Sequence, residues 1–459
     1  MQSFENKKVL VFGLGFNDGG LGMVEYFLKH GALVTITDGK TEEQLSEPLK
    51  KLDKYKDKLI LHLGGQIKDD FLQNDIVIRN PAIKPNNEYI KIAKDAGKQV
   101  EMEMSFFHKN TSCPIIGITG TRGKSTTTTL IYEFLKRKYE EKIFLGGNIG
   151  KSAVRELDNL TLENIAVLEL SSFHLDEMGN GKVSPHVAVM TNIYTDHQDW
   201  HGSMDEYINA KKNIYRYQES DDYLVLNIDN DITKEFVNDS KSKVITYSLL
   251  DPSSTYYMND EMEIFENNKK IFKIDELILQ GKHNRYNILC AVATAKIYDI
   301  GNEMILEVLK EFKGVHGRQE LVRELNGIKF YNDTTATSVE AINAMFETFG
   351  EKNRGKIVMI AGGVDKGLDY TKVVEDMKKY LKGLVLLDGT ASEKIYEYMK
   401  EFLELYKYYD DFNKAIQKAY DIAESGDMVI LCPGASSFNM FLNEFDRGDK
   451  YVKYVNLLK

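Results

Sequence analysis

The residues best suited to chemistry lie in one short stretch, IIGITGTRGKSTTTTLIYEF, at residues 115–134. Gly120 and Gly123 allow a tight backbone turn whose N–H groups can point at phosphate oxygens. Lys124 can reach terminal phosphates, and Ser125, or Thr126 beside it, can bind Mg²⁺. The helix expected after the turn adds the positive end of its dipole. This pattern predicts a phosphate-binding loop.

The loop is shorter than the usual P-loop. The residue five positions before Gly123 is normally glycine and is Ile118 here, so the pattern is G-x-x-G-K-S. A chance glycine turn before a helix is the alternative interpretation. The loop alone also leaves open whether the phosphate drives movement, switching or bond formation.

Further polar residues follow other apolar stretches. Glu169 ends the stretch AVLE and can bind Mg²⁺ directly or through water; a helix-capping glutamate is the alternative. His197, in TNIYTDHQDWHG, is a candidate second metal ligand, although an isolated histidine is more often a surface or core residue. Asn148, in the glycine-rich FLGGNIG, suits a phosphate or amide group of a substrate.

The elements that must position these residues form three series of strands and helices. Apolar strands ending in glycine or polar residues alternate with helical segments, as in α/β sheets that bind ligands at the carboxyl ends of their strands. We therefore predict an α/β protein with three Rossmann-like domains, at residues 1–108, 109–312 and 313–459. The central domain is expected to hold a P-loop ATPase-type parallel sheet, with a small antiparallel side sheet around residues 243–280.

The first series begins with a strand, a glycine turn and a helix that ends at Gly31. The turn, GLGFNDGGLG, breaks the G-x-G-x-x-G fingerprint because position 18 is Asp18, which argues against a nicotinamide oxidoreductase. Asp38 ends the second strand, where an acid can bond to a ribose or a base.

Composition sets limits on the function. The 459 residues carry a net charge of −11, which disfavours nucleic-acid binding. The three cysteines, Cys113, Cys290 and Cys432, form no CxxC pair, so we expect neither a zinc site nor disulfides and favour a reducing cytoplasm. We also expect no signal peptide and no membrane span.

The order of the motifs is similar to that of the Mur ligases, the ATP-dependent amide ligases of peptidoglycan precursor synthesis. The resemblance covers nearly the whole chain and rests on these stretches: TGTRGKSTT, GGNIG, ELSSFHL, TNIYTDHQDWHG, YINAKKNIY, LQGKHNRYN, GVHGRQE, NDTTATS, AGGVDKG and CPGASSFNMFLNEFDRG. It implies a cytoplasmic, monomeric enzyme that uses ATP and Mg²⁺.

The resemblance also implies roles for individual residues. Lys211, in NAKKNIY, would be carbamylated, so that its new carboxylate supports a second Mg²⁺. The neighbouring Lys212 is the alternative candidate for this modification. Without the resemblance, both lysines would be assigned to the solvated surface of a helix. The catalytic residues implied are Lys124, Lys211, His197 and Asn148, and the metal ligands are Ser125, Glu169, His197 and Lys211. The implied ATP-binding residues are Gly120, Thr121, Arg122, Gly123, Lys124, Ser125, Thr126, Asn284, Asn287, Arg318 and Asp333.

The substrate-binding residues implied lie at both ends of the chain. Gly15, Asp38, Asn80 and Pro81 would hold a UDP-linked substrate, and Lys366, Thr337, Ser437 and Phe438 an amino acid. The features of the two ends favour the family member that joins D-glutamate to UDP-N-acetylmuramoyl-L-alanine through an acyl phosphate. No DNPR sequence, associated with the member that adds a diamino acid, occurs.

Some positions depart from the family pattern, namely Arg122, Asn80-Pro81-Ala82, Thr335, the HGR sequence and Glu444. The ligase chemistry implied by the resemblance tolerates all of these departures, whereas the selection of the amino acid depends on them. The alternatives left open are another Mur-type ligase, a folate-extending ligase and a P-loop binding or switch protein without ligase activity. A folate enzyme would not need the first domain.

Overall fold

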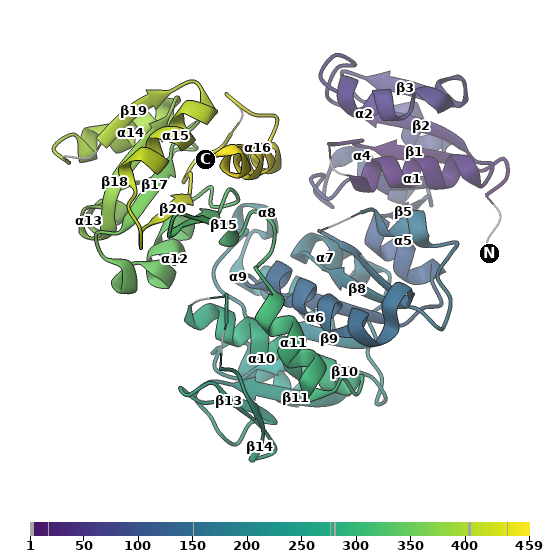
Figure 1. Ribbon diagram of the computed structural model, residues 1–459. Helices are drawn as coiled ribbons and strands as arrows, with labels where there is room; N and C mark the ends of the chain where they lie inside the picture. Colours follow the sequence, from purple (N-terminus) through teal and green to yellow (C-terminus); the bar gives the residue numbers. More distant parts are fainter. Residues whose placement is uncertain are drawn as a thin grey trace. The chain divides into compact units, whose positions relative to one another are not determined.

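The structure, a computed structural model, describes residues 4–16, 18–149, 151–275, 277–279, 281–402, 405–437 and 439–459. The chain folds into two compact units, drawn with their element labels in Figure 1. Unit 1 comprises Met1–Ile274 and Tyr286–Ile305, and unit 2 comprises Asp275–Arg285 and Leu306–Lys459. Over the described part of the chain, no helix combines the length and apolar character needed to cross a bilayer.

The first sheet of unit 1 has five parallel strands. In spatial order they are β3 (Leu59–Leu63), β2 (Leu33–Asp38), β1 (Lys8–Phe12), β4 (Ile76–Arg79) and β5 (Gln99–Glu101). The inner strands β1 and β4 are almost wholly buried, as their continuous apolar sequences predict. Their carboxyl ends, at Phe12 and Arg79, therefore lie together at one edge.

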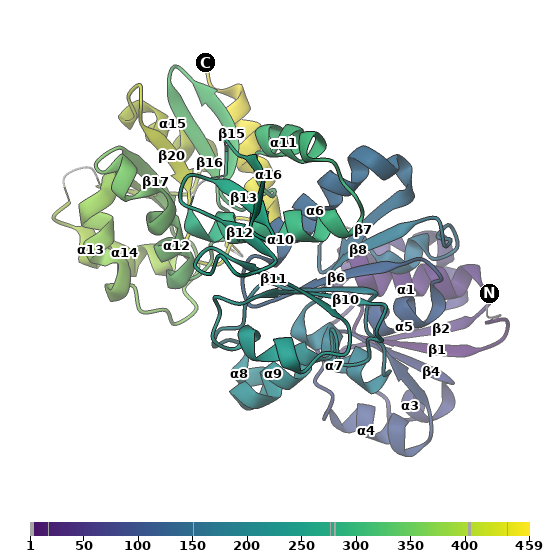
Figure 2. The same ribbon diagram turned by 90° about the horizontal axis from the view of Figure 1, so that it is seen from below.

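Helices cover both faces of this sheet. Helix α1 (Asp18–Lys29) packs on the face of Val9 and Val11, and α3 (Lys68–Gln73) and α4 (Glu88–Asp95) pack on the opposite face (Figure 2). Helix α1 ends as predicted, because Gly31 follows with φ +82°, a left-handed conformation that favours glycine. Helix α2 (Ser46–Lys51) lies between β2 and β3 in the chain.

The central sheet has nine strands. Their spatial order is β14 (Lys269–Lys273), β13 (Glu263–Glu266), β12 (Tyr256–Met258), β11 (Lys243–Ser248), β10 (Tyr223–Asn227), β9 (Val187–Met190), β6 (Ile115–Thr119), β8 (Ile165–Glu169) and β7 (Ile143–Gly147). The order is parallel from β12 to β7. The helices of this region are α5 (Glu103–Asn110), α6 (Lys124–Tyr139), α7 (Ser172–Asn180), α8 (Gln198–His201), α9 (Met204–Lys212), α10 (Lys282–Ile297) and α11 (Asn302–Glu311).

The structure confirms the antiparallel pairing predicted around residues 243–280 for some of these strands, but not a separate sheet. Strands β12, β13 and β14 pair antiparallel, but they extend the central sheet instead of forming a separate one. Strand β11, at residues 243–248, is parallel to both neighbours, so its antiparallel assignment was wrong. Its sequence, KVITYS, suits a half-buried strand of either direction, and sequence alone does not select the partner.

The sheet of unit 2 has six strands. They are β15 (Glu320–Leu325), β16 (Ile328–Asn332), β20 (Met428–Leu431), β17 (Ile357–Ala361), β18 (Leu381–Leu387) and β19 (Leu405–Tyr409), with only β15 antiparallel. The helices are α12 (Val339–Phe349), α13 (Thr371–Tyr380), α14 (Thr390–Met399), α15 (Phe412–Ile422) and α16 (Glu444–Leu457).

The predicted fold class is confirmed, with three α/β sheets and the P-loop on the central one. The first and central sheets belong to one compact unit because a continuous apolar core joins them. Phe106 and Phe107 of α5 are buried in this core together with Phe27 of α1 and Ile115 of β6. The limits of the three domains remain predictions.

Candidate active site

The loop between β6 and α6 has the backbone that its glycines predict. Gly120 has φ +152° and Gly123 has φ +81°, and α6 begins at the next residue, Lys124. A Cβ atom at Gly120 would collide with Thr191 Oγ1, and one at Gly123 with Asn287 Oδ1. Both positions therefore require glycine for conformation and for space.

The segment after β9 holds this loop in shape. Arg122 N donates to Asn192 Oδ1 at 2.9 Å, and Thr191 Oγ1 donates to Arg122 O at 2.6 Å. Thr121 N donates to Asn192 O at 2.9 Å. These bonds between the loop and the segment after β9 fix the backbone of the loop.

Lys124 lies over the loop. Its Nζ donates to the carbonyl oxygens of Gly120 and Thr121, both at 3.0 Å. The ammonium is therefore at the mouth of the turn where a phosphate chain would lie, and a polyphosphate offers it a stronger, charge-assisted partner. Ser125, on the first turn of α6, is buried, while Thr126 is half-buried.

Lys211, in the last turn of α9, contacts the same loop. Its Nζ lies 2.9 Å from Gly120 O and 3.2 Å from Thr119 Oγ1, and the residue is 1% exposed. Burial, followed by the positive charge of Lys124, holds the pKa of Lys211 well below its usual value. The alternative that Lys211 lies on the helix surface is therefore wrong, while its role in catalysis remains a prediction.

Glu169 lies on the strand next to the loop. It ends β8, where it is paired with Ile118 of β6, and it is 1% exposed. Its Oε1 accepts from Asn148 Nδ2 at 2.9 Å, so Asn148 and Glu169 meet as neighbouring site residues. Its Oε2 has no hydrogen-bond partner within the described ranges.

A buried carboxylate oxygen without a partner is costly unless a cation binds it. The residues at this edge fit Mg²⁺, which prefers oxygen ligands and phosphate oxygens. Among the residues that the structure describes, no three His, Cys, Asp or Glu side chains form a metal cluster. A metal here would therefore depend on a mixed set of ligands, including the serine hydroxyl and the phosphates themselves.

His197 lies in the segment that supports the loop. It precedes α8 with φ +49°, and its side chain is 46% exposed. Its Nε2 is 3.6 Å from Asp196 Oδ2, and its ring is 5.1 Å from the ring of Phe173. Its solvent-accessible position leaves it able to bind a ligand.

Tyr207 is a site residue that the sequence reasoning missed. Its hydroxyl is 3.0 Å from Thr121 Oγ1, and Lys211 Nζ lies 4.9 Å from the centre of its ring. The stretch YINAKKNIY contains the signal, because Tyr207 precedes Lys211 by one helical turn and both therefore share a face of α9.

The residues predicted to hold the UDP-linked substrate meet at the edge of the first sheet. Asp38 is buried and accepts from Leu14 N at 3.0 Å and Lys40 N at 2.9 Å. Asn80 Nδ2 donates to Gly13 O at 3.2 Å, and a Cβ atom at Gly15 would lie 2.9 Å from this amide nitrogen. Pro81 follows Asn80 and is half-buried.

Asp18, which breaks the dinucleotide fingerprint, has a structural partner. Its carboxylate accepts from Ser152 N at 2.9 Å and from Arg155 Nη2 at 2.9 Å. The 3₁₀ helix of Arg155 (Ala153–Glu156) follows the glycine-rich segment of Asn148. An acid at the first turn of α1 thus joins the first sheet to the central region, where a dinucleotide-binding fold would have glycine.

In unit 2, most predicted residues follow β16, β17 and β20, whose carboxyl ends share one edge, whereas Arg318 precedes β15. Asp333 is buried and accepts from Gln319 N at 3.1 Å, and burial raises its pKa to about 7. Arg318 and Lys366 are exposed, Thr337 is half-buried, and Ser437 is buried with no partner for its Oγ in the described part. Phe438 lies outside the described residues.

The two predicted asparagines of α10 fall in different compact units. Asn287 belongs to unit 1, where its Oδ1 accepts from Thr127 Oγ1 at 3.4 Å. Asn284, also buried, belongs to unit 2. Asn287 is therefore in contact with the P-loop helix.

Arg447 is a second residue that the sequence reasoning missed. It is fully buried and donates to Thr334 O at 2.8 Å, Thr334 Oγ1 at 3.0 Å and Ala435 O at 3.3 Å. It thereby joins the loops after β16 and β20, which carry Thr337 and Ser437. The sequence feature that could have indicated Arg447 is the RG pair in FLNEFDRG, within helix α16.

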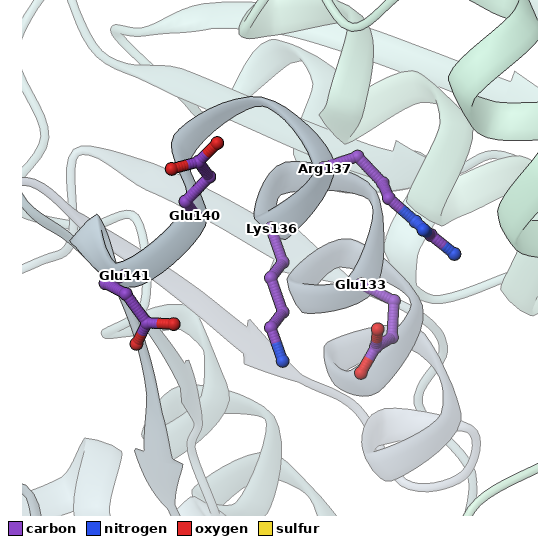
Figure 3. A pocket seen from close by; sticks show the side chains of 5 residues that line it. All are labelled: Glu133, Lys136, Arg137, Glu140 and Glu141. Atoms are coloured by element: carbon purple, nitrogen blue, oxygen red, sulfur yellow. The ribbon is translucent and has the colours of Figure 1, made fainter.

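A separate hollow of about 500 Å³ lies at the other end of α6. Figure 3 shows its side chains, which project from the last turns of the helix and the turn that follows: Glu133, Lys136, Arg137, Glu140 and Glu141. Helix α6 has 16 residues, so this end is roughly 24 Å from the P-loop. The hollow has no part in the site described above.

Comparisons with known proteins cover the whole chain. Family models match residues 7–101 (Mur ligase MurD-like, N-terminal domain), 118–295 (Mur ligase middle domain) and 317–435 (Mur ligase, glutamate ligase domain). Two curated relatives, from Roseiflexus sp. (strain RS-1) and Acetivibrio thermocellus, are each 37% identical, and each bears the name UDP-N-acetylmuramoylalanine--D-glutamate ligase. The first alignment covers 98% of both chains, and the second covers 100% of this chain and 98% of the relative.

Solved structures show the same fold. UDP-N-acetylmuramate-alanine ligase MurC from Thermotoga maritima is 22% identical, with a TM-score of 0.64 over 98% of this chain and 100% of that chain. MurF ligase from Thermotoga maritima in complex with ADP is 18% identical, with a TM-score of 0.60 over 98% and 94%. With relatives at 37% identity along its full length and three family models in order, this chain belongs to the Mur ligase family.

Proposed function

We propose that this protein is an ATP-dependent ligase that joins D-glutamate to UDP-N-acetylmuramoyl-L-alanine in peptidoglycan precursor synthesis. The full-length relatives that bear this name support the substrates. The observation that carries the chemistry is the meeting of Lys124, Lys211 and Glu169 at one glycine loop. A ligase of this class needs such a site to handle the terminal phosphate of ATP.

The reaction proceeds in two steps. A carboxylate oxygen of the alanyl group attacks the γ-phosphorus of ATP, the bond to the β–γ bridging oxygen breaks, and ADP leaves. The amine of D-glutamate then attacks the carbonyl carbon of the acyl phosphate and loses a proton as phosphate leaves. Activation is needed because oxide is a poor leaving group and phosphate is a good one.

The residues of the P-loop act mainly on charge. The ammonium of Lys124 and the backbone N–H groups of residues 123–125, where α6 begins, would stabilise negative charge on the transferring phosphoryl group. Thr121, Arg122, Thr126 and Asn287 of unit 1 would add contacts to the nucleotide. The roles of Asn284, Arg318 and Asp333 of unit 2 in ATP binding are implied by the family resemblance alone. Asn148 orients the Glu169 carboxylate through its bond to Oε1.

Bound Mg²⁺ would neutralise phosphate charge at this site. Ser125, Glu169 and His197 would hold it, with Lys211 contributing after carbamylation. Lys211 suits this modification, because burial and Lys124 lower its pKa and only the neutral amine attacks CO₂. The carbamate keeps one N–H, which can still donate to Gly120 O.

The remaining predicted residues would bind the two substrates. Gly15, Asp38, Asn80 and Pro81 would hold the uridine diphosphate group at the edge of the first sheet. Lys366, Thr337, Ser437 and Phe438 would receive D-glutamate in unit 2. We further propose that the enzyme is a cytoplasmic monomer.

Phosphate release by the purified protein tests this function. The assay contains ATP, Mg²⁺, UDP-N-acetylmuramoyl-L-alanine and one amino acid from a panel. Release that needs both the UDP-linked substrate and D-glutamate is the expected result. Release with a different amino acid would keep the chemistry and reject the proposed substrate, and no release with any pair would reject the ligase.

A further inference from the structure

A buried ion pair connects the substrate edge of the first sheet to the central region. Arg79, the last residue of β4, donates from Nε and Nη2 to Glu177 Oε2 of α7 at 3.0 and 2.7 Å. The two side chains are only 1% and 4% exposed. Arg79 has therefore been removed from water and is bound through two of its three nitrogens to one carboxylate oxygen.

The third nitrogen of Arg79 holds the loop that follows it. Nη1 donates to Ile83 O at 2.7 Å. Within this loop, Ala82 N donates to Asn80 Oδ1 at 2.9 Å, and Asn80 Nδ2 reaches back to Gly13 O. The guanidinium of Arg79 thus closes the turn at residues 80–83. Through Asn80, this turn is hydrogen-bonded to the glycine loop of the first sheet.

Glu177 has a short connection to the P-loop edge. Glu169, which ends β8, is followed by Leu170, whose N–H donates to Ile118 O at 2.8 Å. Ser171 then caps α7 by accepting from His174 N at 3.3 Å. Leu175 and Met178 of the same helix are buried in the core, so packing and hydrogen bonds tie the position of Glu177 to that of Glu169.

Stability alone is a weak reason for this pair. Two charges buried together lose their hydration, and an apolar pair of similar volume is often as stable or more so. Burial and the charge of Arg79 also lower the pKa of the neighbouring His174 to about 4. His174 is itself buried, and its Nδ1 has no partner in the described regions. Hydrophobic residues could fill the place of Arg79 and Glu177 in the core, so packing alone does not explain the guanidinium there.

We propose that Arg79 is a positioning residue that sets the register between the UDP-substrate loop and the phosphate-transfer edge. Glu177 fixes the guanidinium relative to Glu169, and the guanidinium fixes the loop at residues 80–83. The acceptor carboxylate of a substrate held by this loop is thereby brought to the γ-phosphate. This inference rests on the proposed function.

Two variants separate positioning from simple stabilisation. Arg79→Met strands the Glu177 charge and removes the bond to Ile83 O. Arg79→Met/Glu177→Leu also removes the stranded charge, so most of the lost stability returns, but the bond to Ile83 O stays absent. We expect both variants to raise KM for the UDP-linked substrate about tenfold or more and to leave KM for ATP nearly unchanged.

A matched control destabilises the same sheet without touching the loop. Lys109→Met strands Glu101, a buried carboxylate of β5 whose partner Lys109 Nζ is 2.6 Å away. We expect it to lower the thermal stability while KM for the UDP-linked substrate stays at the wild-type value. Arg79→Lys should fall between wild type and Arg79→Met, because an ammonium cannot hold Glu177 and Ile83 O with the same geometry.

Calorimetric titration with UDP provides a second readout that needs no turnover. Wild-type binding of UDP without phosphate release would overturn the proposed function, and Kd of the variants would still test Arg79. A double variant with wild-type KM and wild-type Kd for UDP would overturn the positioning role and leave only a structural one. The same holds if Lys109→Met raises KM as much as Arg79→Met does.

Discussion

Lys211 Nζ lies 2.9 Å from the carbonyl oxygen of Gly120, to which Lys124 Nζ also donates at 3.0 Å. Two amines thus approach one peptide unit from α9 and from α6. Burial, followed by the positive charge of Lys124, lowers the pKa of Lys211 well below its usual value. A lower pKa increases the fraction of unprotonated amine, which is the form that can be modified.

Carbamylation of Lys211 is the first prediction. Protein equilibrated with ¹³C-bicarbonate near pH 8 should show a carbamate carbonyl signal by ¹³C NMR. Lys211→Arg should lose this signal and reduce turnover by about a hundredfold or more, because guanidinium cannot form the carbamate. Lys212→Met is the control, since Lys212 Nζ forms an ion pair with Asp239 Oδ2, at 2.6 Å, and not with the loop. A signal that persists in Lys211→Arg and disappears in Lys212→Met would reject the assignment.

Replacement of Glu169 should separate metal binding from stability. Glu169→Gln keeps the bond from Asn148 through its amide oxygen but removes the buried charge whose Oε2 has no partner in the part of the chain described. We expect the apparent affinity for Mg²⁺ in phosphate release to fall about tenfold or more, because a neutral amide is a weaker ligand. Thermal unfolding without metal should show equal or higher stability. An unchanged Mg²⁺ titration would show that Glu169 is not a metal ligand.

Asp333 should make the stability of unit 2 depend on pH. Burial raises its folded pKa to about 7 from the usual 3.8, so between these values the folded chain keeps a proton that the unfolded chain has released. The free energy of unfolding that this group contributes is therefore greatest near pH 4 and is lost as pH rises towards 7, by at most about 1.4 kcal/mol per pH unit.

Asp333→Asn should remove this dependence. Urea unfolding at pH 5 and pH 8 is expected to show a smaller loss of stability on raising the pH in Asp333→Asn than in wild type. Asp369→Asn, at an exposed position, should behave like wild type. Equal pH dependence in wild type and Asp333→Asn would contradict the raised pKa.

Arg447 should affect the amino acid more than the nucleotide. Arg447→Met leaves the carbonyls of Thr334 and Ala435 without their donor, which costs roughly 2–4 kcal/mol and loosens the two loops that it joins. We expect KM for D-glutamate to rise several-fold and KM for the UDP-linked substrate to change little.

Arg323→Met is the matched control within the same unit. Arg323 Nη1 donates to carbonyls at the end of α16, among them Val455 O at 3.0 Å, and touches neither loop. Both variants should lower the melting temperature, but only Arg447→Met should change KM for D-glutamate. A parallel change in the two variants would assign Arg447 a structural role alone.

Much of the site could be predicted because its parts are local in the chain. An apolar strand, two glycines, Lys124 and a helix follow one another directly, so the loop forms wherever the strand and helix form. Glu169 was predictable for a similar reason, since the carboxyl ends of parallel strands share one edge. Lys211 could be assigned only through resemblance, because nothing in NAKKNIY alone distinguishes a buried lysine from an exposed one.

The partners that join distant segments could not be predicted. Arg79 and Glu177 are 98 positions apart, and Asp18 and Ser152 are 134 apart. Each pair forms because the first sheet packs on the central region through α5, and no periodicity within either segment carries that information. From the sequence, Asp18 therefore indicated only a departure from the dinucleotide-binding pattern. In the structure, it connects the first sheet to the central region of unit 1.

The order of amino acids alone accounts for the strand–loop–helix order, the buried faces and the residue types at the strand ends, since these depend on backbone preferences and on periodicity over a few residues. Tertiary structure decided which side chains lose their water. It buried Lys211 next to Gly120, left Glu169 Oε2 without a partner in the described chain, and placed Arg79 between two segments. Protonation, charge pairing and reactivity depend on the surroundings of a group, and those surroundings come from segments far away in the chain.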